Sequence, residues 1–160
     1  MIVFCDGASN PKTKRSGVGV VWFDKSQFKD PRDGKTLQYG MIPKLKLSKE
    51  IFDSKTKYIY PTNNEAEYIS LIMALEKSID YGLEYVDIYM DSKLVVNQVN
   101  NKWKINFEHL QELKNKVDIL RSKISSRVFH VRREYNTHAD KESKRCLSRQ
   151  PPNPFEEWKK

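Results

Sequence analysis

The chain opens with Met1-Ile2-Val3-Phe4-Cys5-Asp6-Gly7, an apolar run that leads directly into an aspartate and a glycine. Five consecutive apolar residues are enough for one buried β-strand. A carboxylate at the end of a buried strand is costly unless a partner offsets its charge. A metal ion is one such partner, and three acids further along the chain occupy positions from which they could share it. We therefore expect Asp6 to belong to a functional site around which the fold is organised.

The composition is that of one globular domain with a strong positive charge. The chain has 160 residues, 38% of them hydrophobic, and a formal net charge of +8. This charge points to a polyanionic partner, nucleic acid first, although a basic surface that only aids solubility is the alternative. Cys5 and Cys146 match neither a metal-ligand spacing nor a disulfide framework. Without a signal peptide or an apolar stretch of about 18 residues, we expect a cytoplasmic monomer with no membrane partner.

Hydrophobic periodicity predicts five strands and four helices. Four of the strands are expected at residues 1–5, 18–23, 85–90 and 127–132, and one more within 24–61, where 36–42 and 57–60 are the candidates. The helices are expected at residues 65–81, directly after Thr62-Asn63-Asn64, and at 92–99, 107–124 and 136–147. Three early strands on short links favour antiparallel pairing, and later strands that alternate with helices favour parallel additions. The predicted fold is an α/β domain over residues 1–150, with a five-stranded mixed sheet flanked by helices, and a C-terminal tail over 151–160.

Four acids fall at the ends of these elements or in their helices. Asp6 and Asp91 each end a predicted strand, and the carboxyl ends of parallel strands are where such sheets bind ligands. Glu67 lies in the first turn of one helix and Asp140 in the last helix. Their carboxylate oxygens suit Mg²⁺ or Mn²⁺. Each acid also has an ordinary alternative: a turn for Asp6-Gly7, a helix-dipole partner for Glu67, an N-cap for Asp91 and a surface charge for Asp140.

In order and spacing, these acids and their neighbours resemble the type 1 ribonuclease H family. The matching stretches are Asp6-Gly7-Ala8-Ser9-Asn10-Pro11, Thr62-Asn63-Asn64-Glu65-Ala66-Glu67, Asp91-Ser92 and Asn136-Thr137-His138-Ala139-Asp140. The resemblance implies a ribonuclease H-like fold and an endonuclease that cuts the RNA strand of an RNA–DNA hybrid. It also implies two Mg²⁺ ions, with Mn²⁺ possible, and products with a 5′-phosphate and a 3′-hydroxyl. Two ions can clamp the attacking and leaving oxygens of such a displacement.

The resemblance also assigns roles to the acids. Asp6 would bridge both ions, Asp140 would join it on the ion that activates water, and Glu67 and Asp91 would join it on the ion near the leaving oxygen. The chain lacks the glycine-rich loop with a histidine that many bacterial members have, and is similar to the shorter archaeal and bacterial variant. Glu134 would then assist product or metal release. The basic handle helix is also missing, because residues 100–107 are predicted as a loop.

Substrate contacts follow from the same resemblance. A hybrid is recognised by its shape and its 2′-hydroxyls, which short polar side chains can contact. The implied contact residues are Ser9, Asn10, Thr62, Asn63, Asn64, Lys93 and Trp103. Lys93 replaces a glutamine found in many relatives, and Trp103 has a packing role as its alternative. Two other functions remain open: a non-catalytic hybrid-binding or connection domain, and another nuclease of this fold, such as a double-stranded RNA nuclease or a junction resolvase.

Overall fold

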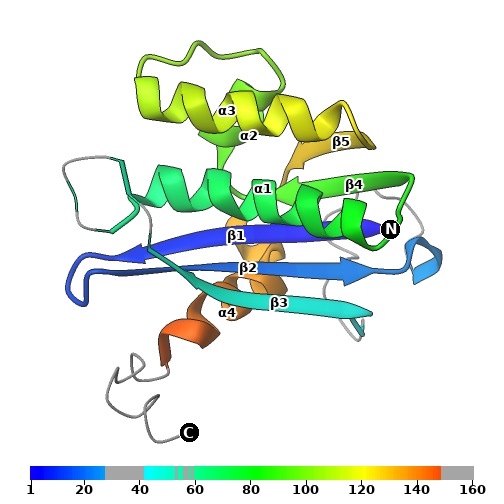
Figure 1. Cartoon of the computed structure of the whole chain (residues 1–160). Coiled ribbons are helices and arrows are strands. Elements are labelled where there is room, and N and C mark those ends of the chain that lie inside the picture. Colours follow the sequence, from blue (N-terminus) through cyan, green and yellow to red (C-terminus); the bar gives the residue numbers. More distant parts are fainter. Residues whose placement is uncertain (28–41, 53, 56–57, 59, 149–160) are drawn as a thin grey trace, which may run out of the picture.

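The computed structural model describes residues 1–27, 42–52, 54–55, 58 and 60–148. Five strands form one sheet in the order β3-β2-β1-β4-β5, with helices on both faces (Figure 1). The strands are β1 (Ile2–Asn10), β2 (Arg15–Phe23), β3 (Leu45–Ile51), β4 (Tyr85–Met90) and β5 (Ser125–His130). The helices are α1 (Asn63–Asp80), α2 (Lys93–Val99), α3 (Glu108–Arg121) and α4 (Thr137–Arg145). The predicted mixed sheet and the predicted order of strands and helices are confirmed.

Strand β1 lies at the centre of the sheet and has two kinds of partner. It pairs antiparallel with β2 along its whole length, from Ile2 to Asn10. It pairs parallel with β4 only over 2–4, where the last pair is Phe4 with Tyr89. Strand β3 adds antiparallel to β2, and β5 adds parallel to β4. Beyond Phe4, strand β1 therefore continues with β2 as its only strand partner in the part of the chain that the structure describes.

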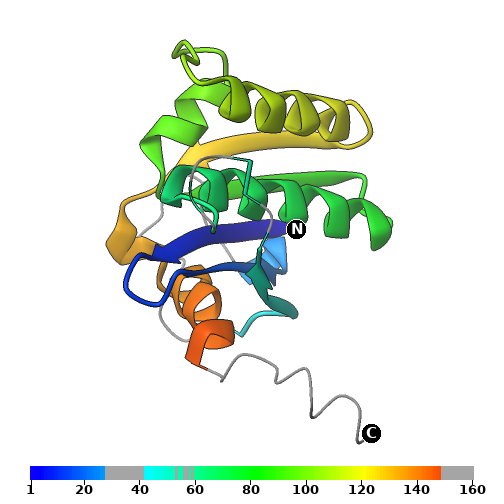
Figure 2. The same ribbon diagram turned by 60° about the vertical axis from the view of Figure 1, so that its left-hand side comes forward.

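Helices α1, α2 and α3 cover one face of the sheet and α4 covers the other (Figure 2). Side chains alternate along β1: Val3 and Cys5 join the larger core under α1 to α3, whereas Ile2 and Phe4 join the smaller core beside α4. This two-sided burial explains why the first strand is an unbroken apolar run. Among the described residues, no helix has the length and apolarity needed to cross a membrane.

Two glycines let helices approach the sheet at close range. A Cβ atom at Gly7 would lie 2.2 Å from the carbonyl carbon and oxygen of Ala66 in α1. A Cβ atom at Gly19 would lie 2.3 Å from the carbonyl oxygen of Ala139 in α4. Any residue with a side chain would hold these helices away. The glycines therefore set the helices that carry Glu67 and Asp140 directly against the central strands.

Two sequence predictions were wrong in position. The third strand is Leu45–Ile51, not 36–42 or 57–60; residues 36–41 lie outside the described part of the chain, and Tyr58 and Tyr60 are not in the sheet. The exposed Lys49 stands in phase with Leu47 and Ile51 on this edge strand, so it interrupts the apolar alternation that would have revealed the strand. Strand β1 also continues to Asn10, because β2 pairs with it throughout. The predicted tail, 151–160, lies outside the described residues.

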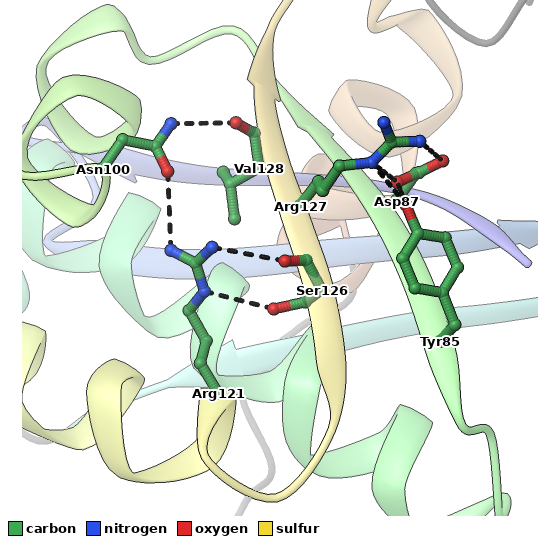
Figure 3. A network of polar contacts seen from close by, with 7 residues as sticks. All are labelled: Tyr85, Asp87, Asn100, Arg121, Ser126, Arg127 and Val128. Carbon is green, nitrogen blue, oxygen red and sulfur yellow. Dashed lines mark hydrogen bonds and ion pairs between the residues drawn. The ribbon is translucent and has the colours of Figure 1, made fainter.

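A polar network fastens the edge strand β5 to the helices beside it (Figure 3). Arg121, at the end of α3, donates from Nε to Ser126 Oγ at 3.1 Å and from Nη2 to the Ser126 carbonyl at 3.4 Å. Asn100, which follows α2, donates from Nδ2 to the Val128 carbonyl at 2.9 Å. These bonds fix β5 relative to α2 and α3.

A second network on the other face of β5 holds a buried carboxylate (Figure 3). Asp87 in β4 is fully buried. Arg127 binds it with both ends of its guanidinium, Nε to Oδ1 at 2.9 Å and Nη2 to Oδ2 at 3.1 Å. The Tyr85 hydroxyl also donates to Asp87. A buried charge needs such complete pairing, so this cluster has a structural explanation within the sheet.

Candidate active site

Three of the predicted acids converge where the parallel strands end. Asp6 lies within β1, Glu67 within the first turns of α1, and Asp91 directly after β4. One carboxylate oxygen from each lies within 4.8 Å of the other two. Asp6 was predicted at the end of its strand, but β1 continues beyond it. Asp6 lies just past the last parallel pair of β1 with β4, and this position places it at the carboxyl edge of the parallel strands.

The fourth acid, Asp140, borders this group on the side of α4. Its carboxylate lies close enough to Asp6 to raise the pKa of the Asp6 carboxyl. Ser143, one turn later, has its Oγ 3.4 Å from Asp6 Oδ2 and donates to the Asp140 carbonyl at 2.7 Å. Lys144 Nζ lies 3.2 Å from Asp140 Oδ2. Asp140 is thus beside Asp6, outside the compact group of three.

The ordinary alternatives for two of these acids are wrong, and another residue can fill the role proposed for a third. Asp6 and Gly7 are strand residues, not a turn. Ser92, not Asp91, caps α2, because its hydroxyl accepts from the backbone N–H of Val95 at 3.3 Å. At the start of α1, Glu65 supplies the acidic side chain and forms a capping box with Thr62.

Burial and mutual repulsion make the acids hard to ionise together. Burial first, and then the charges of Asp91 and Asp140, raise the pKa of the Asp6 carboxyl to about 7. Burial and the Asp6 charge raise the pKa of Glu67 well above its usual range. Burial also raises the pKa of Asp91, although a hydrogen bond from Asn136 opposes the shift. A cation between these groups would favour their ionised forms.

The donor set fits a divalent ion. All four side chains offer carboxylate oxygens, the ligands that Mg²⁺ and Mn²⁺ prefer. Glu67 Oε2 is enclosed by protein and has no hydrogen-bond partner among the described residues. An enclosed acceptor without a partner is costly, and a bound cation would offset that cost. Asp6, Glu67 and Asp91 could therefore hold an ion, with Asp140 as a further donor beside Asp6.

Most of the predicted substrate-contacting residues gather at the start of α1. The Ser9 backbone N–H donates to Asn63 Oδ1 at 2.9 Å, which joins β1 to the helix. Asn63 and Asn64 are exposed, and Thr62 is the N-cap. Asn10 lies at the hairpin turn, where its Oδ1 accepts a hydrogen bond from the backbone N–H of Lys12 at 3.0 Å. Cap and turn roles are thus present, and the exposed amides of α1 remain accessible to a ligand.

The other predicted residues lie around the acids without joining them. Lys93 is the exposed first residue of α2. Trp103 is 45% exposed in the loop between α2 and α3. The Glu134 side chain is 62% exposed on a short 3-10 turn before α4, with Arg132 Nη1 3.8 Å from its Oε1. Glu134 is therefore near the last acid in sequence and outside the acid group in space.

Sequence reasoning missed two kinds of contribution. It gave Asn136 no role of its own, yet Asn136 Nδ2 donates to Asp91 Oδ2 at 3.1 Å. Two histidines also lie near the last acids in sequence. His138 in α4 packs edge-on against Phe23, with 5.3 Å between the ring centroids. His130 is exposed, and its charge favours ionisation of Asp91. The place of Asn136 in the last motif was the only available signal.

A family model described as reverse transcriptase-like matches residues 52–146, more than half of the chain. The chain belongs to this family. Ribonuclease HI of Halobacterium salinarum is 35% identical over 80 residues, 49% of this chain and 40% of the relative. A Mycobacterium tuberculosis protein named as bifunctional is 35% identical over 143 residues, 88% of this chain and 34% of the relative. The chain thus spans well under half the length of these curated relatives.

Solved ribonucleases H share the fold. The crystal structure of ribonuclease H1 from Halobacterium salinarum has a TM-score of 0.74 at 25% identity, covering 92% of this chain and 96% of that one. The N-terminal ribonuclease H domain of the mycobacterial protein has a TM-score of 0.71 at 25% identity, covering 92% of both. A ribonuclease H1 isolated from compost, solved in complex with an RNA/DNA hybrid, has a TM-score of 0.71 at 26% identity, covering 91% and 98%. The predicted resemblance to type 1 ribonucleases H is confirmed.

Proposed function

We propose that this chain hydrolyses the RNA strand of RNA–DNA hybrids with two divalent metal ions, leaving a 5′-phosphate and a 3′-hydroxyl. The observation that carries the proposal is the convergence of Asp6, Glu67 and Asp91 within 4.8 Å at the carboxyl edge of the sheet. Asp140, the fourth acid of the family motifs, lies beside Asp6 at the border of this group. A domain that only binds hybrid would not need a costly group of neighbouring carboxylates around the buried Asp6.

Asp6, Glu67, Asp91 and Asp140 would hold the ions. When bound, a pair of divalent ions supplies charge stabilisation for the attacking and leaving oxygens of phosphodiester hydrolysis. The chain contributes the placement of its own carboxylates: Gly7 sets Glu67 against β1, and Lys144 contacts Asp140 at 3.2 Å. Fixed placement raises the reaction rate, because a small displacement of a catalytic group lowers the rate strongly. We assign Glu134, exposed and outside this group, to product or metal release.

The substrate would lie across the start of α1 and the loop after α2. Exposed amides of Asn63 and Asn64 suit the 2′-hydroxyls of the RNA strand, and Ser9 and Asn10 belong to the same polar surface. Trp103 is flanked by exposed Lys102 and Lys104, a combination that suits a sugar–phosphate backbone and so the DNA strand. The similar compost ribonuclease H1 was solved with an RNA/DNA hybrid, which supports this substrate class.

A substrate panel tests the proposal. Labelled RNA–DNA hybrid, RNA duplex, DNA duplex and four-way junction would each be incubated with Mg²⁺, Mn²⁺ or a chelator. We expect cleavage of the hybrid alone, in its RNA strand, and only with a divalent ion. The product ends can be read by treating the fragments with phosphatase. Cleavage of the RNA duplex or of the junction would favour another nuclease of this fold, and hybrid binding without cleavage would favour a connection domain.

A further inference from the structure

Asn136 occupies the place where β1 and β4 stop pairing. The parallel ladder ends with Phe4 opposite Tyr89. One residue later, the carbonyl of Cys5 accepts a hydrogen bond from Asn136 Nδ2 at 3.1 Å. The same nitrogen donates to Asp91 Oδ2, also at 3.1 Å. A side-chain amide therefore bridges the two chain segments beyond the last backbone pair.

The orientation of this amide is determined by its partners. A carbonyl and a carboxylate can only accept, so the Asn136 side chain must present its NH₂ group to both. The residue is 1% exposed, so water has little access to these bonds. With Oδ2 held, the Asp91 carboxylate cannot turn without breaking a partly buried hydrogen bond. Asn136 thus restricts the Asp91 carboxylate more than a hydrogen bond at the protein surface would.

Asn136 forms hydrogen bonds at or next to three of the four acids. Cys5 directly precedes Asp6, and Asp91 is bound through its side chain. The backbone carbonyl of Asn136 accepts from the N–H of Asp140 at 3.0 Å. Of the four acids, Glu67 is positioned by a different element, α1. Asn136 is therefore the point at which β1, the segment after β4 and the start of α4 are joined.

We propose that Asn136 is a positioning residue for the metal site, which holds the Asp91 carboxylate at a fixed place relative to Asp6. This inference rests on the metal-dependent function proposed above. Hydrogen-bond partners that orient metal ligands typically contribute about 10- to 100-fold to metal affinity. Asn136 acts through Asp91 and need not touch the ion or the substrate. Its loss should therefore weaken metal binding even when no substrate is present.

The direct test is Mn²⁺ binding to the full chain by titration calorimetry, without nucleic acid. Asn136→Ala should weaken Mn²⁺ binding about 10- to 100-fold. Asn136→Ser, which fills more of the space and keeps a hydroxyl, is the second variant if Asn136→Ala does not fold. Asn100→Ala is the matched control, because it also removes a hydrogen bond from a side-chain amide to a strand carbonyl, that of Val128. It should lower the melting temperature and leave Mn²⁺ affinity unchanged.

A double-mutant cycle separates positioning from general destabilisation. If Asn136 acts through Asp91, adding Asn136→Ala to Asp91→Ala should cause no further loss of Mn²⁺ affinity. Unchanged affinity in folded Asn136→Ala, or equal additive losses in the cycle, would overturn the inference. If the wild type fails to cut hybrid while Asn136→Ala still weakens Mn²⁺ binding, the proposed function fails and the positioning role stands. If the wild type cuts hybrid and Asn136→Ala binds Mn²⁺ normally, only the positioning role fails.

Discussion

Gly7→Ala is the substitution whose effect on the site can be worked most directly from the structure. The added Cβ atom would lie 2.2 Å from the carbonyl carbon and oxygen of Ala66 and 2.5 Å from the nitrogen of Glu67, whereas ordinary contact begins at 3.4 Å. All three are backbone atoms, so no change of rotamer relieves the overlap. Because protein interiors are close-packed, α1 would have to retreat from β1 by about 1 Å.

This retreat has two measurable consequences. Overpacking of this kind costs about 1–3 kcal/mol. For a chain of this length each kcal/mol lowers the melting temperature by about 2–4 °C, so we expect a fall of roughly 2–12 °C. Glu67 is part of the displaced turn, and its carboxylate now lies within 4.8 Å of Asp6 and Asp91. Mn²⁺ affinity and hybrid cleavage should therefore fall together with stability.

Thermal unfolding by circular dichroism and Mn²⁺ titration of the same samples would measure both effects. Gly82→Ala is the matched control, since Gly82 has a φ of +75° and no atom within 4 Å of a Cβ placed there. That substitution should cost about 1–2 kcal/mol in backbone strain without changing Mn²⁺ affinity. A Gly7→Ala protein with wild-type melting temperature and wild-type Mn²⁺ affinity would refute the close approach of α1 as the basis of the site.

Four further outcomes test the site. Asp91→Asn should abolish cleavage while folding and hybrid binding persist, because the amide keeps the shape and loses the charge; near-normal turnover in Mg²⁺ would exclude the four-acid site. Glu134→Ala should slow steady-state turnover more than single-turnover cleavage, because Glu134 is exposed outside the acid group; equal losses would assign it to the chemical step. The folded Asp6 carboxyl, with its pKa raised from 3.8 to about 7, holds a proton that the unfolded chain has released, so the metal-free protein should lose stability as pH rises from about 4 to about 7. Melting curves in chelator should show a smaller decline for Asp6→Asn, and identical declines would contradict the shift. Hybrids with one, two, four and eight consecutive ribonucleotides should be cut with rising efficiency, whereas efficient cutting at a single ribonucleotide would contradict recognition of several 2′-hydroxyls.

The parts of the fold that could be predicted are those with a strong apolar pattern. Strand β1 is an apolar run because both of its faces are buried, and α1 has a periodic apolar face against the sheet. Strand β3 lies at the edge, where the exposed Lys49 stands in phase with Leu47 and Ile51, so the alternation in its sequence is interrupted. Pattern reasoning finds buried elements well and edge strands poorly.

The candidate site divides in a similar way. Asp6 and Asp91 were predictable because acids beside buried strands are unusual and need a partner. The contribution of Asn136 was not predictable, because its side-chain amide donates hydrogen bonds to a carbonyl 131 residues earlier and to a carboxylate 45 residues earlier. No local pattern specifies contacts across such distances. They depend on where β1 and β4 stop pairing, which only the assembled sheet determines.

The two partners of β1 also imply an order of folding. Pairing with β2 closes only the short turn at residues 11–14, whereas Ile2 meets Asp87 in β4 only after the whole α1 crossover has formed. Contacts between near neighbours in sequence form sooner than contacts between distant ones. The hairpin that carries Asp6 can therefore be in place before Asp91 arrives. The repulsion between these carboxylates therefore arises only when β4 joins the hairpin.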